Sequence, residues 1–259
     1  MFGIALTTPV LHAQFVVKLA PQTVAEFDAY TRTVEDSLNE RWHGPKNFLA
    51  IDDDPANRQR VLAGEVYIQP VSPNAIPVSI KDGLIHDWRG AIYLPHTTPQ
   101  RVLGILQDFD NHKHIYPAIA DSRLVERKGE NDLVGYWRLQ QKGIVPVILE
   151  VEQEAHYAQL GSGKWNCRAY ARHITEVDAT LFNHGHRYPE GEGHGYLWRL
   201  YAYWTLEAVD GGVLAECRTL SLSRDIPESI AWAVAPYIRK TPMQSLTSTL
   251  SDTRKAALH

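Results

Sequence analysis

Cysteine is scarce in this sequence, and its scarcity argues against one class of sites. The 259 residues include only two cysteines, Cys167 and Cys217, and no CxxC pair. A cysteine-based zinc site needs paired ligands at short spacing, so no such site is expected. We also expect neither a bound metal of another kind nor a cofactor. The two thiols either form one disulfide across neighbouring strands or lie buried as free cysteines, and burial is common for free cysteines.

The sequence also lacks an excess of positive charge and a long apolar run. Its 26 basic and 30 acidic residues give a net charge of −4, so we expect no nucleic acid partner. No stretch beyond the first residues approaches the ~20 apolar residues of a membrane span, and we expect membrane contact to be transient at most. The 44% hydrophobic and 22% charged residues are typical of a globular domain.

The first residues carry part of a targeting pattern. Residues 1–11 are mostly apolar, and Leu11-His12-Ala13 is similar to a small-residue cleavage site, but a charged n-region is missing. Residues 1–14 are therefore either the remnant of a signal peptide or a plain apolar N-terminus. The first alternative predicts a periplasmic or secreted protein, and the second a cytoplasmic one.

An amphipathic helix is predicted next. Thr23 and Glu26 fit a capping box, and Gly44-Pro45 ends the pattern. One apolar stripe recurs at three- and four-residue steps, formed by Val24, Phe27, Tyr30, Val34 and Leu38. The polar face is acidic and does not suit an anionic membrane, so we expect the helix to pack on the rest of the chain.

A domain boundary is expected where prolines interrupt regular structure. Residues 61–71 have a strand-like composition, and prolines then predict a linker over residues 69–81. Residues 15–82 are thus expected to form an N-terminal helix and linker extension, followed by a main domain over residues 83–259.

The main domain is predicted to be an antiparallel sheet flanked by helices. A strand over residues 85–94 and a helix from Thr98 come first, and strand patterns then follow one another over residues 122–223. Glycine-rich turns at residues 161–163 and 210–212 separate them and predict hairpins. The close spacing indicates an antiparallel meander rather than βαβ units.

A long C-terminal helix is predicted over residues 226–258. Pro236 and the start signal Thr241-Pro242 predict that it consists of two collinear or bent segments. A single helix laid across a curved sheet leaves part of the concave side unfilled, and such apolar spaces are where small ligands bind.

This order of elements resembles the helix-grip fold of the START-like superfamily, which includes lipid-transfer domains and polyketide cyclase/dehydrase-like proteins. The residues that carry the resemblance include Ile85-His86-Asp87-Trp88-Arg89-Gly90, Gln107-Asp108-Phe109-Asp110-Asn111-His112 and Leu222-Ser223-Arg224-Asp225-Ile226-Pro227. The match covers about residues 83–258. It implies an α+β fold in which a curved antiparallel β-sheet wraps around a long C-terminal helix. It implies no particular activity, because this superfamily hosts carriers, cyclases and hydrolases.

The predicted function is the binding or carrying of an apolar small molecule, such as a lipid, an isoprenoid or a polyketide-like ring, in an internal cavity. The alternative is a cyclase/dehydrase-type enzyme that acts on an aromatic or polyketide-like substrate by general acid/base catalysis. The residues expected to bind the ligand are Trp88, Tyr116, Trp137, Arg199, Tyr201, Tyr203, Arg218, Trp232 and Tyr237.

Strand alternation leaves the direction of the last hairpin open. Tyr201 and Tyr203 share one face, which is directed either to the cavity or to solvent. Arg218 and Glu216 share a face on the next strand, and if that face is interior their charges need partners, with Arg199 as a neighbour across the hairpin. The other interpretation is an ion pair on the surface.

Two groups of titratable residues remain. His184, His186 and His194 lie in a glycine-rich segment and are interpreted as metal ligands, as part of a lid or ligand contact, or as a solvated loop. His86 and Asp87 on the first strand of the main domain are candidates for an acid or base near the cavity.

Overall fold

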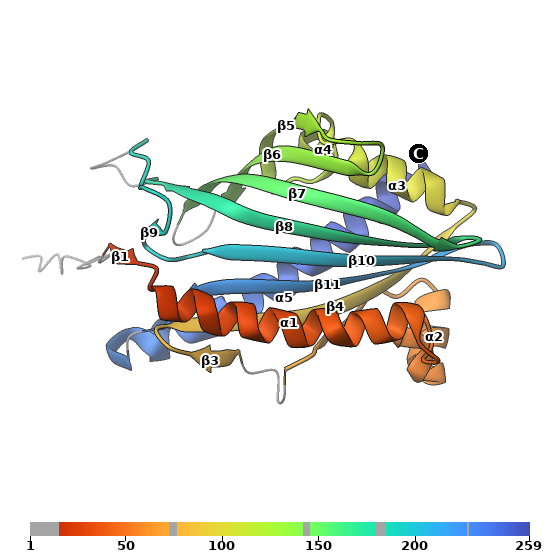
Figure 1. Ribbon diagram of the computed structural model, residues 1–259, viewed down its shortest axis with the longest axis horizontal. Helices are drawn as coiled ribbons and strands as arrows, with labels where there is room; N and C mark the ends of the chain where they lie inside the picture. Colours follow the sequence, from red (N-terminus) through yellow and green to blue (C-terminus); the bar gives the residue numbers. More distant parts are fainter. Residues whose placement is uncertain (1–15, 73–76, 142–145, 180–184, 227) are drawn as a thin grey trace, which may run out of the picture.

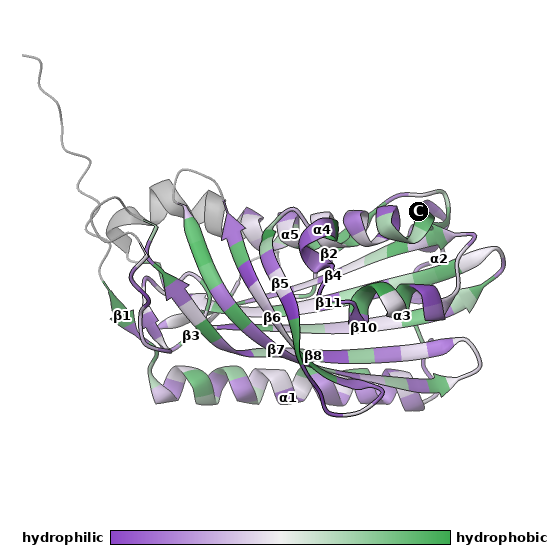
Figure 2. Cartoon of the chain, turned by 90° about the horizontal axis from the view of Figure 1, so that it is seen from above, coloured by the Kyte–Doolittle hydropathy of each residue, from purple (hydrophilic) through white to green (hydrophobic). Residues whose placement is uncertain are grey.

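The computed structural model describes residues 16–72, 77–141, 146–179, 185–226 and 228–259, except the side chains of 228–239. Within these residues the chain has an α+β fold, in which a curved nine-stranded antiparallel sheet lies between two long helices. Figure 2 shows α5 on one side of the sheet and α1 on the other. The helix-grip architecture predicted from the sequence is confirmed, with α5 in the hollow of the sheet and α1 as an additional layer outside.

The main sheet has the strand order β2-β4-β11-β10-β8-β7-β6-β5, and β3 also pairs with β4 (Figure 1). Its strands are β2 (Tyr67–Pro70), β3 (Val78–Ile80), β4 (Gly83–Pro95), β5 (Ile119–Arg127), β6 (Asp132–Gln141), β7 (Val147–Gly161), β8 (Lys164–Val177), β10 (Arg199–Val209) and β11 (Gly212–Arg224). A separate two-stranded ribbon joins β1 (Val17–Lys18) to β9 (Glu192–Gly193). The helical elements are α1 (Pro21–His43), η1 (Ala50–Asp53), α2 (Pro55–Leu62), α3 (Pro99–Gln107), α4 (His112–Ile115) and α5 (Glu228–Leu258).

The concave core lies between the sheet, α3 and the second half of α5. Leu246 and Leu250 of α5 are buried in one cluster with Ile92 of β4 and Trp204 of β10. The helix comes close to β4 at Gly90, where a Cβ atom would lie 2.4 Å from Cδ1 of Leu250. Side-chain packing therefore fills this end of the hollow.

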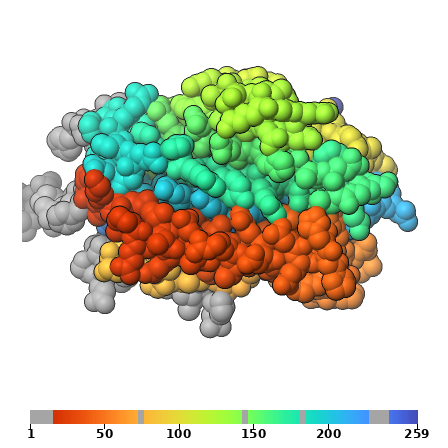
Figure 3. Space-filling model, viewed as in Figure 1, coloured from red at the N-terminus to blue at the C-terminus, as the bar shows by residue number. Residues whose placement is uncertain are grey.

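The convex face has a core of its own beneath α1. Phe27, Val34 and Leu38 of the predicted apolar stripe are buried against this face, and the Phe27 ring lies 5.2 Å from the ring of Tyr201. Trp42 Nε1 donates a hydrogen bond of 3.1 Å to Thr205 Oγ1. The prediction that this helix packs on the main domain is confirmed, and Figure 3 shows α1 and α2 covering the lower part of that face.

The predicted capping box at the start of α1 is wrong. The helix begins at Pro21, and Ala20 provides no side-chain cap. Thr23 Oγ1 instead donates to the carbonyl of Lys81 at 2.7 Å, and Glu26 accepts the Lys81 N–H at 2.9 Å. Both residues attach the helix to the chain just before β4, so their spacing served a tertiary contact and not a cap.

The segment before residue 82 is more structured than the predicted linker. Residues 55–62 form α2, whereas the sequence predicted a strand from residue 61, and β2 and β3 both hydrogen-bond to β4. The predicted boundary at residue 82 therefore falls between two paired strands. The sheet extends into the N-terminal part of the chain.

Helix α5 is continuous, where the sequence predicted two segments. It runs for 31 residues and contains Pro242 in its interior. A proline removes one helical hydrogen bond, and the burial of Leu246 and Leu250 one and two turns later offsets that loss. Among the helices of the described ranges, none combines the length and the apolar character needed to cross a membrane.

The two cysteines are free and buried on the concave face. Cys167 of β8 and Cys217 of β11 are both register partners of Trp204, because β10 lies between their strands. Two strand spacings amount to about 10 Å, more than the ~7 Å that a disulfide spans. The alternative of two free thiols is the correct one.

Candidate functional site

Strand alternation places the charged and the uncharged side chains of β4, β10 and β11 on opposite faces of the sheet. The charged residues of these strands share the parity of the convex face, and they are Asp87, Arg89, Arg199, Glu207, Glu216, Arg218 and Arg224. Within the described part of these strands the concave face carries no charged side chain. His86 lies on the concave face, and burial lowers its pKa to about 4, so the imidazole is neutral at neutral pH.

One row of register partners crosses five strands on the concave face. It runs from His86 through Ser221, Leu200 and Ala171 to Gln153. The three polar members are 3%, 8% and 4% exposed, in the order His86, Ser221, Gln153. The row therefore holds three buried polar side chains, all of them uncharged.

The hydrogen bonding of this row is incomplete. His86 Nε2 lies 3.2 Å from Oγ of Ser223. In the portion of the chain that the structure describes, the Gln153 amide and the Ser221 hydroxyl have no side-chain hydrogen-bond partner. Among the described residues, the fully buried side-chain atoms without a partner are Thr31 Oγ1, Trp165 Nε1, Arg168 Nε and Trp198 Nε1. Gln153 and Ser221 are not in this group, so we expect a water molecule or a ligand to satisfy their polar atoms.

The next row toward the packed end of the hollow consists mostly of small side chains. Trp88 pairs with Thr219, and the row continues through Ala202, Ala169 and Ala155. Helix α5 packs chiefly on β4 and also contacts β11. The sheet therefore contributes small side chains to the interior over β10, β8 and β7, where Ala155 and Ala169 are buried in the same concave cluster as Trp204.

Trp88, Tyr116 and Trp137, three of the residues expected to bind ligand, border the hollow. The polar atoms of Tyr116 and Trp137 already have hydrogen-bond partners within the protein. Trp137 Nε1 donates to Nδ1 of His112 at 2.9 Å, and the Tyr116 hydroxyl lies 3.0 Å from Oγ1 of Thr253. The ring of His112 contacts both aromatic rings. Trp88 packs against the concave core. These residues form a wall of the hollow, and the polar atoms of Trp137 and Tyr116 are occupied.

Four other expected ligand residues lie on the convex face or at its end. Tyr203 donates a 3.0 Å hydrogen bond to Oε1 of Glu35 in α1, and Tyr201 packs on α1 as described above. The side chains of Tyr201 and Tyr203 therefore face neither the cavity nor solvent, because α1 covers this face of the sheet. Arg199 donates to the backbone carbonyls of Arg172 and Trp198.

The predicted partners of Arg218 and Glu216 are also corrected. Arg218 pairs with Asp87 and not with Arg199, so this aspartate is directed away from the hollow. Glu216 accepts the backbone N–H groups of Ala50 and Ile51, at 2.9 and 2.5 Å. The sequence predicted that α1 packs on the main domain, but it carried no signal for which face of the sheet the helix covers.

The remaining two expected residues, Trp232 and Tyr237, belong to the first half of α5. Their side chains lie outside the described residues, as does His184. Ligand binding by these residues stays a prediction.

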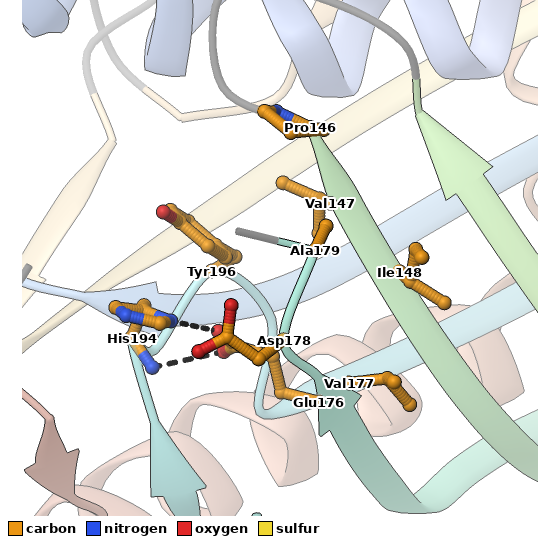
Figure 4. Close-up of a pocket in the computed structure, with 9 residues that line it drawn as sticks. All are labelled: Pro146, Val147, Ile148, Glu176, Val177, Asp178, Ala179, His194 and Tyr196. Carbon is orange, nitrogen blue, oxygen red and sulfur yellow. Dashed lines mark hydrogen bonds and ion pairs between the residues drawn. The ribbon is translucent and has the colours of Figure 1, made fainter. Parts of the chain in front are cut away.

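A second cluster of titratable side chains lies at the edge of the sheet where β8 ends. Glu176 and His194 are nearly buried, with 8% and 7% of their side chains exposed, and Glu176 Oε1 bonds to Nδ1 of His194. Its other oxygen accepts the His194 backbone N–H at 3.0 Å. Figure 4 shows this pair beside a small pocket, with about 10 Å³ of open space, that Asp178 and Tyr196 also line.

This pair has the geometry of a carboxylate-oriented imidazole. Glu176 holds Nδ1, so Nε2 is the free nitrogen, and the described residues provide no hydrogen bond to it. A histidine oriented in this way can accept or donate a proton at Nε2. The sequence identified His194 within a glycine-rich segment but missed Glu176, whose spacing of 18 residues carries no local pattern.

Comparisons with known proteins return structural likenesses only. No protein-family model matches the chain, and no curated protein matches its sequence. A STAR-related lipid transfer protein fragment from Xanthomonas axonopodis has 17% identity and a TM-score of 0.44, over 73% of this chain and 98% of that one. The protein TTHA0849 from Thermus thermophilus has 16% identity and a TM-score of 0.46, over 66% of this chain and 95% of that one.

A third likeness is to the Zhui aromatase/cyclase from Streptomyces sp. R1128, with 9% identity and a TM-score of 0.43, over 67% of this chain and 93% of that one. Scores and identities this low do not assign a function. The assignment of the fold rests on the strand order and the position of α5.

Proposed function

We propose that the chain binds or carries an apolar small molecule between the first half of α5 and the concave face of the sheet. The observation that carries this proposal is the uncharged concave surface of small side chains, Ala155, Ala169, Ala171 and Ala202, next to two unpartnered polar groups. Small side chains leave volume, and an apolar lining with few polar groups is typical of ligand pockets. The partner is a small molecule, and membrane contact is limited to its uptake or release.

The convex face supports the same assignment by exclusion. Several of its charges are paired or hydrogen-bonded beneath α1, as in the contacts of Arg218 with Asp87 and of Glu216 with the start of η1. A second pocket on that side, lined by Arg89 and Tyr203 among others, has only about 10 Å³ of open space, enough for one water molecule. We therefore place the ligand on the side of α5.

The experiment is to fill the proposed space. Ala171 is fully buried in the middle of the polar row, and Ala171→Phe would place a ring where the ligand lies. We expect the variant to stay folded, with a thermal midpoint close to that of the wild type. Binding of the apolar dye N-phenyl-1-naphthylamine should fall at least about tenfold.

The matched control is Ala215→Phe. Ala215 is also fully buried, but it lies in the packed part of the concave core with Ile92 and Leu206. Overpacking there costs about 1–3 kcal/mol or more. If Ala171→Phe destabilises the protein as much as Ala215→Phe, the hollow is solid and the proposal is wrong.

A second candidate function is a cyclase/dehydrase-type enzyme, and the Glu176–His194 pair favours it. In such a reaction Nε2 of His194 would remove a proton from the carbon next to the hydroxyl-bearing carbon of the substrate. A C=C bond forms as the C–O bond breaks, and the imidazolium returns the proton to the leaving hydroxyl, which departs as water. The test is mass spectrometry of an aromatic polyketide-like ligand after incubation with the protein. Loss of water that disappears in His194→Gln supports the enzyme, and a ligand recovered unchanged supports the carrier.

A further inference from the structure

The polar row on the concave face defines the kind of group that the interior can accept. Gln153, Ser221 and His86 are register-linked across the sheet and are each more than nine-tenths buried. The Gln153 amide offers a donor and an acceptor, and the Ser221 hydroxyl does the same. No hydrogen bond to either group is found among the described residues. The row therefore has donors and acceptors that are available to a ligand.

A charged ligand does not suit this place. The charged groups of β4, β10 and β11 belong to the opposite face, where Arg218 is 2.6 Å from Asp87 and is already neutralised. His86 is uncharged at neutral pH because burial lowers its pKa to about 4. In the described parts of β4, β10 and β11, no charged side chain on this face could pair with a carboxylate or an ammonium group on the ligand, and burial of an unpaired charge is strongly unfavourable.

A purely apolar ligand does not suit the row either. It would cover the Gln153 amide and the Ser221 hydroxyl and exclude water from them without offering a hydrogen bond, which is unfavourable. A hydroxyl or a carbonyl group supplies the missing hydrogen bonds without a charge. The rest of such a molecule would lie over the neighbouring row, where Ala202 and Ala169 face the hollow.

We infer that the ligand is an apolar molecule with one uncharged hydrogen-bonding group, an alcohol or a ketone, which binds to Gln153. Ser221 lies three strand spacings away, about 14 Å along the row, so the same group does not reach it. This inference rests on the proposed function and narrows it to a ligand class. It separates neutral lipids and hydroxylated or oxidised ring systems from fatty acids and amines.

The test compares ligands that differ only in their polar end. 1-Dodecanol, 2-dodecanone and dodecanoate compete with N-phenyl-1-naphthylamine for the full-length protein at pH 8. We expect the alcohol and the ketone to bind at least about tenfold more tightly than the carboxylate. Equal or tighter binding of dodecanoate overturns the inference and leaves the proposed function intact.

Two variants locate the effect. Gln153→Leu keeps the size of the side chain and should weaken dodecanol binding by roughly fivefold to tenfold, with dodecanoate unchanged. Ser221→Ala, at the other end of the row, should leave the dodecanol affinity unchanged. The matched control is Gln159→Leu, an exposed glutamine on the same strand, which should change neither affinity. If Gln153→Leu keeps the wild-type preference for the alcohol over the carboxylate, the inference is wrong. If no compound or dye binds at all, the proposed function fails with it.

Discussion

Asp87 on β4 and Arg218 on β11 form a two-point ion pair across neighbouring strands, with N–O distances of 2.9 and 2.6 Å. The pair is almost completely buried, at 1% and 7% exposure. Tyr30 of α1 donates to the same carboxylate at 2.8 Å. The charges thus sit between sheet and helix and connect the two layers.

Breaking this pair should be costly, because one charge would remain buried alone. We expect Arg218→Met to lower the free energy of unfolding by about 3–5 kcal/mol, measured by urea denaturation. The double variant Asp87→Leu with Arg218→Met should recover a large part of that loss, since both charges are gone. A single variant that costs less than about 1 kcal/mol would show that the pair is hydrated and not sealed beneath α1.

The contribution of α1 can be measured at Phe27. Its side chain is fully buried against the convex face, so Phe27→Ala should destabilise the protein by about 3–5 kcal/mol. Ser37→Ala, on the exposed side of the same helix, should change stability by less than about 0.5 kcal/mol. Protease cleavage within α1 should be faster in the Phe27 variant only, and cleavage that is equally fast in the wild type would contradict the packing of this helix.

Two glycines give opposite predictions for the same substitution. A Cβ atom at Gly135 would lie 1.9 Å from the ring of Phe109, so Gly135→Ala should cost about 1–3 kcal/mol by displacing that ring. Gly104 lies in α3 with open space around the added atom, and Gly104→Ala should stabilise the protein by about 0.5–1 kcal/mol. Thermal unfolding of the two variants decides between these signs.

The neutral state of His86 predicts a pH dependence. Its pKa is about 4 in the folded protein and about 6.5 when unfolded, so the unfolded chain binds the proton more readily. The stability that His86 contributes is present above pH 6.5 and is lost as the pH falls toward 4. Between about pH 7 and pH 4 the wild type should lose roughly 3 kcal/mol more than His86→Gln in urea unfolding. If the free energy of unfolding depends on pH in the same way in both proteins, the imidazole of His86 is exposed to water and the prediction is wrong.

The fold was predictable because its signals are local. Alternating strand residues and the turns at 161–163 and 210–212 appear in the structure as β7, β8 and the β10–β11 hairpin, where Gly211 has a φ of 78°. The apolar stripe of α1 predicted both the helix and its burial. These patterns depend on neighbours in the sequence, which is why they needed no tertiary information.

The site was predictable only in part. Alternation separated Tyr201 and Tyr203 from Trp204, but it does not say which of two buried faces looks into the hollow. Both faces of this sheet are covered, so polar-tipped aromatic residues were assigned to the wrong layer. The row of Gln153 and Ser221 depends on the register of five strands, and a register is a tertiary property.

Native mass spectrometry of the full-length protein, purified without detergent and offered 1-dodecanol, tests the central claim most directly. An apolar ligand held under α5 predicts a complex of one protein and one alcohol that Ala171→Phe does not form. A spectrum of ligand-free protein alone, across all ligand concentrations and for wild type and variant alike, would contradict the account.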